Sequence, residues 1–389
     1  MNEADPLQAV AAVREIIIDG REAAERTGCL GDAVVAALRR AGVFRLYLPR
    51  SLGGLEVDPV TCARVTEAIA RCDSAAAWYV MVGNAAKLMA AAWPRELAEE
   101  VLGADPDVLV AASGNRPFLA VAGQRDGEPG FLLSGRNGFV SGCRHARWLL
   151  SPIQIGSGPD AQRRTALVPM AAATIVDNWD TLGMRGTGSN DVTLEQVWVP
   201  ARHTVAMADP AAGAVRNAHY QGTLYRCSGR VVFATYVPVT LVLAEQALAA
   251  LQALAVSKTP YASEAALASR ESAQRAYGEA LGIYRAAHGY FYAELEAAWN
   301  RACAGEEAQP KHRADLYLAG THAVQSSARV VRLVADAAAS SVIYADQPLQ
   351  RVLRDMETLR HHGFVSPARF ANVAQIYWDV PLTYPLLLR

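Results

Sequence analysis

The order in which hydrophobic patterns change along the chain is the feature that most restricts its fold. Residues 1 to about 112 show helical periodicity, whereas about 113 to 212 hold short runs rich in Val, Leu, Phe and Thr between Gly, Pro, Asp and Asn. Alanine-rich helical periodicity then returns and continues almost to the end. This order predicts an α+β, mainly α, chain with an N-terminal α-helical domain (1–112), a central β domain (113–212) and a C-terminal helical bundle (213–389).

Turn-forming residues divide the last two domains into elements. Breaks near Thr259-Pro260, Ala304-Gly305 and Gln347-Pro348 separate four or five long antiparallel helices, the pattern of a bundle. In the central domain, turn residues bound four segments with the composition of strands. These predicted strands are FLLSG (131–135), RWLLSPIQI (147–155), RTALVPM (164–170) and DVTLEQVWV (191–199).

Charge and composition exclude several classes of partner. Lys and Arg number 37 and Asp and Glu 38, so no net field attracts a polyanion and we expect no nucleic-acid partner. The longest apolar run, Val231 to Ala244, contains Pro238 and is too short for a bilayer, so we expect a buried helix and no membrane span. The first residues, MNEADPLQAV, are acidic where a secretory signal is basic, which predicts a cytoplasmic protein. The six cysteines include no CxxC pair and are expected to be reduced.

The segment GMRGTGSNDVTLEQVWVP, residues 183 to 200, is the most specific motif. Three glycines allow the backbone to approach a planar ligand closely, and Thr187, Ser189 and Asn190 can form hydrogen bonds there. A glycine-rich β turn without a ligand would have the same composition. Composition alone therefore leaves both interpretations open.

Three segments carry a family resemblance. Residues 183–200 resemble the GxRGTGSxDV segment of the acyl-CoA dehydrogenase superfamily, in which the loop and its strand lie beside the flavin. The segment SGRNGFVSGCRHARW (134–148) resembles SGxWxFxSGCxHAxW of the two-component flavin monooxygenase branch, and PLQRVLRDMETLRHHGF (348–364) is similar to its PLxRxxRDxxTxxxH helix. Together with the GxFxLxxPxxxGG-like residues 42–54, these matches span nearly the whole chain in family order.

The resemblance implies the acyl-CoA dehydrogenase fold, with a β-barrel as the central domain and a four-helix bundle as the last. It also implies an enzyme that receives reduced FAD or FMN by diffusion from a separate NAD(P)H:flavin reductase and uses O2 through a flavin C4a-hydroperoxide. We expect no metal, because the sequence lacks the Glu-x-x-His pairs of a di-metal bundle.

Site residues follow from the same resemblance. In this branch the serine that matches Ser141 lies near flavin N5, so Ser141 is assigned to catalysis as well as to cofactor binding. A homotetramer is implied, and Arg270 and Gln274 on a bundle helix are candidates for reaching a neighbour's flavin phosphate, although exposed helix residues look the same. The expected flavin contacts within the chain are Phe139, Ser141, Gly142, Thr187, Ser189 and Asn190.

Catalytic groups distinguish the two branches. A dehydrogenase needs a glutamate base, and the two places where the family carries it read HHGFVSPARF (361–370) and YRCSGRVV (225–232). Glu357 and Glu245 remain, so a dehydrogenase stays an alternative. A histidine can polarise or remove the proton of a phenol near neutral pH, and the family helix aligns with His362 rather than with its neighbour.

The choice between His361 and His362 also depends on the helix. If the helix continues through them, both fall off its apolar stripe and point about 100° apart, so only one can face the flavin. Two solvated histidines interacting with the helix end are the alternative.

Two departures from the branch affect the substrate pocket. Asn137 stands where the branch usually has Trp, and the region Asn84 to Lys87 lacks a further active-site histidine. Ser113 matches a serine that lines the substrate site in some relatives, although such a serine can equally bond to its own backbone. We name Ser113 and Asn84 as substrate-binding candidates.

The predicted substrate is a phenolic or polycyclic, polyketide-like aromatic small molecule, since His362 suits phenol activation. Three alternatives stay open. They are an N-hydroxylase of an amine or amino sugar, an acyl-CoA dehydrogenase, and a flavin-free, non-redox scaffold or cyclase.

Overall fold

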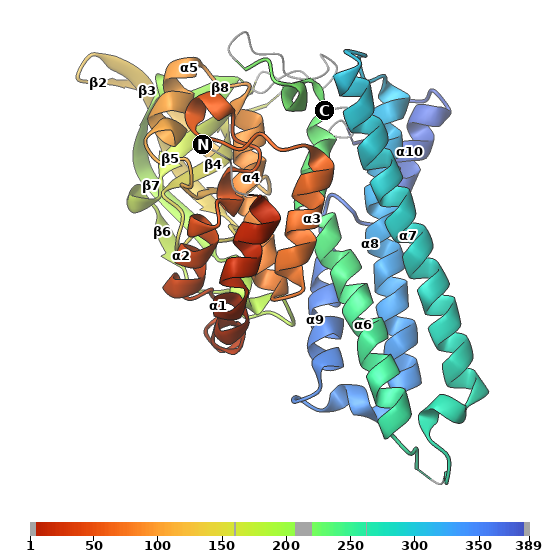
Figure 1. The fold of residues 1–389 in the computed structure, drawn as a ribbon. Coiled ribbons are helices and arrows are strands. Elements are labelled where there is room, and N and C mark those ends of the chain that lie inside the picture. Colours follow the sequence, from red (N-terminus) through yellow and green to blue (C-terminus); the bar gives the residue numbers. More distant parts are fainter. Residues whose placement is uncertain (1–4, 159–160, 207–219, 262, 385–389) are drawn as a thin grey trace.

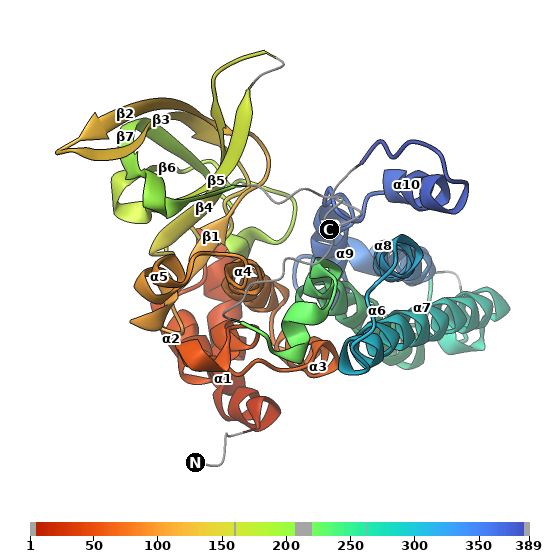
Figure 2. The ribbon, with the colours of Figure 1, turned by 90° about the horizontal axis from the view of Figure 1, so that it is seen from above.

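The computed structural model describes residues 5–158, 161–206, 220–261 and 263–384. Helices of the N-terminal third cover one side of a sheet, and the long helices of the last third stand beside this body (Figures 1 and 2). The predicted fold class, mainly helical with a central β domain, is confirmed.

Acidic caps start several N-terminal helices. The Asp5 carboxylate accepts a hydrogen bond from Leu7 N, the Asp58 carboxylate from Thr61 N, and the Asp73 carboxylate from Ala76 N at 2.7 Å. Each cap satisfies a backbone N–H that the first helical turn leaves free. The helices are α1 (Pro6–Thr27), α2 (Asp32–Arg40), α3 (Pro59–Ala70), α4 (Ser74–Ala90) and α5 (Arg95–Ala98).

The central domain is a mixed sheet whose hydrogen-bonded strands follow the order β6-β7-β3-β2-β4-β5-β8, with β1 also on β4. The four predicted strands are confirmed as β3, β4, β5 and β7. Three of the strands that the sequence did not reveal have only three residues each, too few for a visible alternation. The strands are β1 (Val110–Ala112), β2 (Phe118–Arg125), β3 (Glu128–Asn137), β4 (Trp148–Ile155), β5 (Gln162–Pro169), β6 (Thr174–Val176), β7 (Asp191–Pro200) and β8 (Thr204–Ala206).

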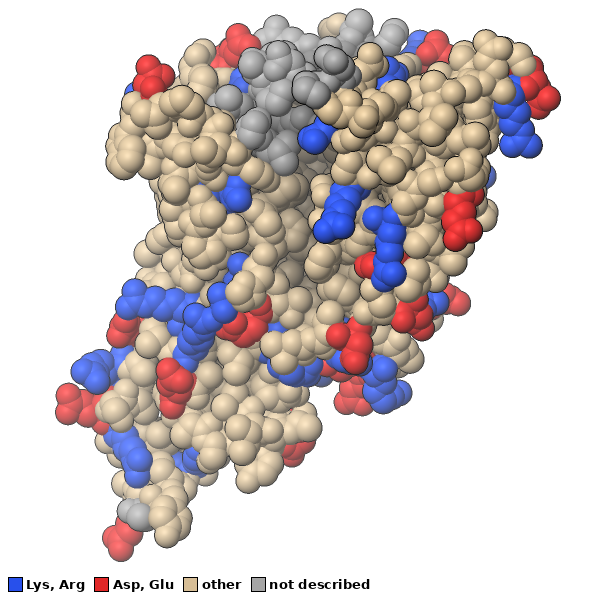
Figure 3. All heavy atoms as spheres, turned by 180° about the vertical axis from the view of Figure 1, so that it is seen from behind, with Lys and Arg blue, Asp and Glu red and all other residues tan. Residues whose placement is uncertain are grey.

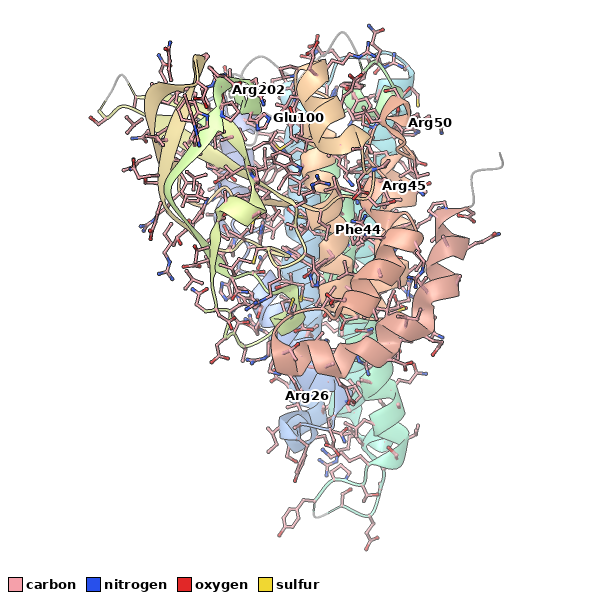
Figure 4. The ribbon with its side chains drawn as sticks, turned by 90° about the vertical axis from the view of Figure 1, so that its left-hand side faces the viewer. Arg26, Phe44, Arg45, Arg50, Glu100 and Arg202 are labelled. Atoms are coloured by element: carbon pink, nitrogen blue, oxygen red, sulfur yellow. The ribbon has the colours of Figure 1, made fainter. Side chains whose placement is uncertain are left out.

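A polar contact joins the sheet to the helices. A π-helical turn, Glu99–Gly103, follows α5 and presents Glu100 to the end of β7. Figure 4 shows Glu100 next to Arg202, and the Glu100 carboxylate also lies 2.9 Å from Nε2 of the buried His203. Phe44, in the same view, is fully buried within the helical layer.

In the C-terminal bundle, two helices end at the predicted breaks near Pro260 and Gly305, and the third predicted break, at Pro348, is where a helix begins. Its longest helices pack on one another, with α8 contacting both α6 and α7, and the short α9 lies on α6 and α8 (Figure 1). The helices are α6 (Val237–Ser257), α7 (Glu271–Cys303), α8 (Pro310–Ala338), α9 (Pro348–Leu359) and α10 (Ala368–Tyr377).

One helical segment of the described chain, Gly229–Ser257, is long and apolar enough by length and composition to cross a membrane. Half of its most apolar window is buried inside the protein, and α6 packs on α3, α8 and α9. Core helices of globular proteins have the same character. On the face shown in Figure 3, acidic and basic side chains are interspersed.

Candidate active site

The indole of Trp78 connects the two residues assigned to catalysis. Trp78 lies on α4, and its Nε1–H donates a hydrogen bond of 3.1 Å to Ser141 Oγ. Its ring also meets the imidazole of His362 edge to face, with 5.5 Å between ring centroids. Ser141 and His362, far apart in sequence, therefore contact the same side chain.

The turn that carries Ser141 is held by the glycine-rich segment. Phe139 and Gly142 have φ values of +61° and +69°, so the chain bends sharply on both sides of Ser141. Val140 N donates to Asn190 O at 3.1 Å, and Gly142 N donates to Thr187 O at 3.0 Å. The two sequence motifs thus form one structural unit.

Three buried hydroxyls of this unit lie in contact. The Ser141 and Ser189 Oγ atoms are 2.7 Å apart, and so are Ser189 Oγ and Thr187 Oγ1. Thr187 Oγ1 in turn donates to Met184 O at 2.8 Å. The structure brings these predicted cofactor residues together.

Asn190 and Phe139 differ in what they offer a ligand. The buried Asn190 amide accepts from Asn178 N and Trp179 N, both at 3.0 Å, and so fixes the loop that carries Trp179. Phe139 is 65 % exposed and meets the Trp179 ring edge to face. Asn190 therefore shapes the loop, whereas Phe139 presents an apolar surface beside Ser141.

His362 lies in a turn and not on a helix. The helix does not continue through it, because α9 ends at Leu359 and His362 N donates to Leu359 O at 3.0 Å. This turn leaves His361 exposed and directs His362 toward the rings of Trp78, Tyr236 and Phe364. The centroid distances to Tyr236 and Phe364 are 5.6 and 5.1 Å.

The surroundings of His362 keep its ring neutral. Burial lowers the pKa of His362 to about 4, since no acidic group compensates the loss of water. Phe364 N–H donates to Nδ1 at 3.4 Å, an arrangement that assigns the hydrogen of the neutral ring to Nε2. Near pH 7 the imidazole therefore has an Nε2–H donor that no described residue accepts.

Asn84 is corrected as a substrate-binding residue. Its side chain is fully buried, its Nδ2 donates to Val43 O and Val80 O at 2.8 Å, and its Oδ1 accepts from Tyr47 N at 3.0 Å. Both amide hydrogens are thus used to join α4 to the turn after α2. The amide has no donor left for a substrate.

The Ser113 hydroxyl bonds within the chain, to the end of β3. Its hydroxyl lies 2.7 Å from Gly138 O and 3.0 Å from Asn137 Oδ1, and Asn137 Nδ2 donates to Ser151 Oγ at 2.8 Å. All three side chains are buried. Asn137, in place of the usual Trp, therefore ties the ends of β1 and β3 to β4.

Arg270 and Gln274 are exposed at the start of α7. Gln274 Nε2 donates to Ala268 O at 2.8 Å. Figure 1 shows this end of α7 at the free end of the bundle, away from the sheet. Within one chain they are not part of the Trp78 cluster, which consists of Trp78, Ser141, Tyr236 and His362.

A buried carboxylate that the sequence did not reveal clamps the site. Asp355 on α9 is buried, and its carboxylate accepts from Met184 N and from Ser74 Oγ, both at 2.6 Å. Arg351, one turn earlier, pairs with Asp73 at 2.7 Å. The two acidic side chains connect α9, α4 and the glycine-rich segment. The sequence feature that could have indicated this contact is an Arg and an Asp four residues apart beside an apolar stripe.

Two hollows are outlined by described residues away from the Trp78 cluster. The larger, of about 440 Å³, lies against α8 and α9 and is lined by residues that include Leu182, Arg332 and Leu353. The smaller lies between α7 and α8. The part of the chain that the structure describes contains no group of three His, Cys, Asp or Glu residues placed to hold a metal ion.

Comparisons with known proteins agree with this architecture. The model for the acyl-CoA dehydrogenase N-terminal domain matches residues 8–101, and the model for the C-terminal domain matches residues 234–367. Indole-3-acetate monooxygenase of Acinetobacter baumannii is 26 % identical over 97 % of both chains. The flavin-dependent monooxygenase oxygenase subunit HsaA of Mycobacterium tuberculosis is 25 % identical over 95 % of this chain and 94 % of its own.

A solved structure supports the fold. XiaF from Streptomyces sp., in complex with FADH2 and glycerol, superimposes with a TM-score of 0.90 at 21 % identity, over 98 % of this chain and 97 % of that one. The chain therefore belongs to the acyl-CoA dehydrogenase-like family, in the branch of two-component flavin-dependent monooxygenases.

Proposed function

We propose that this oxygenase hydroxylates a phenolic or polycyclic aromatic small molecule with O2 and reduced FAD or FMN, which a separate NAD(P)H:flavin reductase supplies by diffusion. The observation that carries the proposal is that Ser141 and His362 both contact the indole of Trp78. A cofactor-facing hydroxyl and a substrate-facing imidazole are thereby held at a fixed separation.

The residues around Ser141 fit a flavin. The exposed ring of Phe139 offers a flat apolar surface, and Ser141 Oγ lies at the base of a turn whose backbone is bound to the glycine-rich segment. A bound reduced flavin would supply the electrons that activate O2. The protein's part is to hold the ring system and to exclude competing reactions.

His362 is the group that we assign to substrate activation. Its neutral ring presents Nε2–H, which can donate to the oxygen of a phenol that has released its proton to solvent, and so stabilise the phenolate form. A phenolate is the more nucleophilic form and so attacks an electrophilic oxygen more readily. The geometry supports hydrogen-bond donation by His362 better than proton removal.

Aromatic rings around His362 favour an aromatic substrate and a dry site. Trp78, Tyr236 and Phe364 all lie within 6 Å of the imidazole, measured between ring centroids. Edge-to-face contacts of this kind recognise a further aromatic ring, and their apolar surfaces exclude water. The relative from Acinetobacter baumannii is likewise named for an aromatic substrate.

The glutamates that kept the dehydrogenase alternative open have other partners. Glu357 pairs with Arg332 and Arg360, which hold its pKa below the usual value despite partial burial. Glu245 pairs with Arg71 on α3. The lowered pKa makes Glu357 a poor base, and Glu245 is held by its arginine, which favours the monooxygenase over the dehydrogenase.

The test is turnover of the purified chain with an added flavin reductase, NADH, FMN or FAD, catalase and ¹⁸O2. Mass spectrometry should find one labelled oxygen on members of a panel of phenols and fused aromatics. Labelled oxygen only on an amine or amino sugar would establish the N-hydroxylase instead, and desaturation of an acyl-CoA would establish the dehydrogenase. If no class of substrate gave a flavin-dependent product, the result would support the flavin-free scaffold.

We also propose that the protein is a cytoplasmic homotetramer with flavin sites completed across subunits. The reductase needs no stable complex with it, since reduced flavin can diffuse between the two proteins.

A further inference from the structure

The hydrogen bonds around Ser141 form a continuous chain. It starts at Trp78 Nε1–H, passes through the hydroxyls of Ser141, Ser189 and Thr187, and ends at Met184 O. Its O···O distances are 2.7, 2.7 and 2.8 Å, so each contact requires one hydrogen between the two oxygens. All three hydroxyl side chains are buried.

The two ends of this chain fix the direction of every hydrogen in it. Met184 O can only accept, so the Thr187 hydroxyl hydrogen points to it. The hydrogen between Thr187 and Ser189 must then come from Ser189, and the hydrogen between Ser189 and Ser141 must come from Ser141. At the other end, the indole N–H can only donate, which places it on a lone pair of Ser141 Oγ.

We propose that Ser189 and Thr187 are positioning residues that make Ser141 an acceptor and thereby select reduced over oxidised flavin. With its hydrogen committed to Ser189 and one lone pair to Trp78, Ser141 Oγ has one lone pair left for the site. N5 of a reduced flavin carries a hydrogen and can donate to that lone pair. N5 of an oxidised flavin carries a lone pair and repels it. The inference rests on the proposed function, since it requires a flavin beside Ser141.

Two variants release the Ser141 hydrogen in different ways. Ser189→Ala removes the acceptor of that hydrogen, which then turns toward N5. Thr187→Val is nearly isosteric and removes the acceptor of the Ser189 hydrogen. The Ser189 hydrogen then turns to Ser141 Oγ, so the Ser141 hydrogen is freed and turns toward N5. Both variants convert Ser141 into a donor that suits the oxidised flavin.

The experiment is anaerobic titration of each protein with oxidised FMN and with dithionite-reduced FMN. Wild type should bind reduced FMN more tightly, and in both variants the ratio of the two dissociation constants should fall about threefold to tenfold, the effect of one neutral hydrogen bond. The two-electron midpoint potential of bound FMN should fall with it, by about 30 mV for a tenfold change.

Three controls separate this role from a structural one. Thr187→Ser keeps the hydroxyl and should keep the wild-type ratio. Thr181→Val removes a neighbouring hydroxyl that donates to Gly183 O outside the chain, and should leave the ratio unchanged. In a Ser141→Ala background, Ser189→Ala should cause no further change, because its effect passes through Ser141.

The outcomes distinguish this inference from the proposed function. Wild type that prefers reduced FMN while both variants retain the same ratio would overturn the inference and leave the function intact. Wild type that binds neither redox state of FMN nor of FAD would overturn both. If Thr181→Val also lowered the ratio, the change would be a general effect of packing and would not result from the hydrogen-bond chain.

Discussion

At the scale of single residues, the protonation state of His362 is open to a direct test. Its pKa, lowered to about 4 by burial, lies below the value of a histidine in the unfolded chain, about 6.5. As the pH falls from 6.5 to 4, the unfolded state takes up a proton that the folded state does not. The His362 contribution to stability is therefore present above pH 6.5 and is lost toward pH 4, at up to about 1.4 kcal/mol per pH unit.

The measurement is chemical denaturation of wild type and His362→Asn between pH 4 and 8. The variant should lose less stability than wild type as the pH falls, because its side chain does not titrate. His361→Asn is the matched control, since His361 is exposed and adjacent and should retain the wild-type pH dependence. Equal slopes for His362→Asn and wild type would show that the imidazole is solvated.

Motifs located the side chains that we assign to catalysis, but not the groups that hold them. Ser141 and His362 stand in segments whose spacing is specific, so their positions could be predicted from the sequence. The contacts of Asn84 and the clamp by Asp355 are long-range: Tyr47 N donates to Asn84 Oδ1 and Met184 N donates to Asp355 Oδ1, and folding alone brings these groups together. No local pattern reports such contacts, and the role predicted for Asn84 was wrong for that reason.

At the scale of elements, the glycine-rich segment depends on its close approach to α9. A Cβ added at Gly183 would lie 2.3 Å from the carbonyl carbon and oxygen of Arg354, atoms of the helix backbone that cannot move alone. Gly183→Ala should therefore push the segment off α9, stretch the bond from Met184 N to Asp355, and destabilise the protein by roughly 1–3 kcal/mol.

Gly278→Ala provides a control of opposite sign. Gly278 lies within α7 with open space around its Cα, so alanine there should stabilise the protein by about 0.5–1 kcal/mol through helix propensity. Urea denaturation of both variants gives the comparison. A Gly183→Ala protein as stable as wild type would mean that α9 and the segment are not in rigid contact.

Elements were predictable where their patterns are long. Four central strands and the breaks after α6 and α7 agree with the structure because Pro and Gly flank them, whereas the eight-residue β2 was missed. The end of α9 was not predictable from periodicity, since Arg360 and His361 are compatible with further helix and no breaker precedes Gly363. Tertiary contacts of His362 with Trp78 and Tyr236 stabilise the turn instead.

At the scale of the whole molecule, the Trp78 cluster draws on all three predicted domains. Trp78 comes from an N-terminal helix, Ser141 from the turn after β3, and Tyr236 and His362 from the C-terminal part. The hydrophobic order of the sequence predicted the three parts. Their mutual placement depends on buried polar clamps such as Asp355. It could be predicted from the sequence only through the family resemblance.

The exposed start of α7 gives the last prediction, which joins assembly to cofactor binding. Arg270 and Gln274 lie at the free end of the bundle, so in the proposed tetramer they would meet the flavin phosphate of a neighbouring subunit. Light scattering should therefore give the mass of four chains.

Arg270→Ala should weaken binding of FMN and FAD about tenfold, as expected for a charge-assisted hydrogen bond, and leave binding of riboflavin, which lacks a phosphate, unaffected. Arg275→Ala, at another exposed arginine of the same turn, should change neither affinity. A monomeric protein, or equal losses for FMN and riboflavin, would place the phosphate elsewhere.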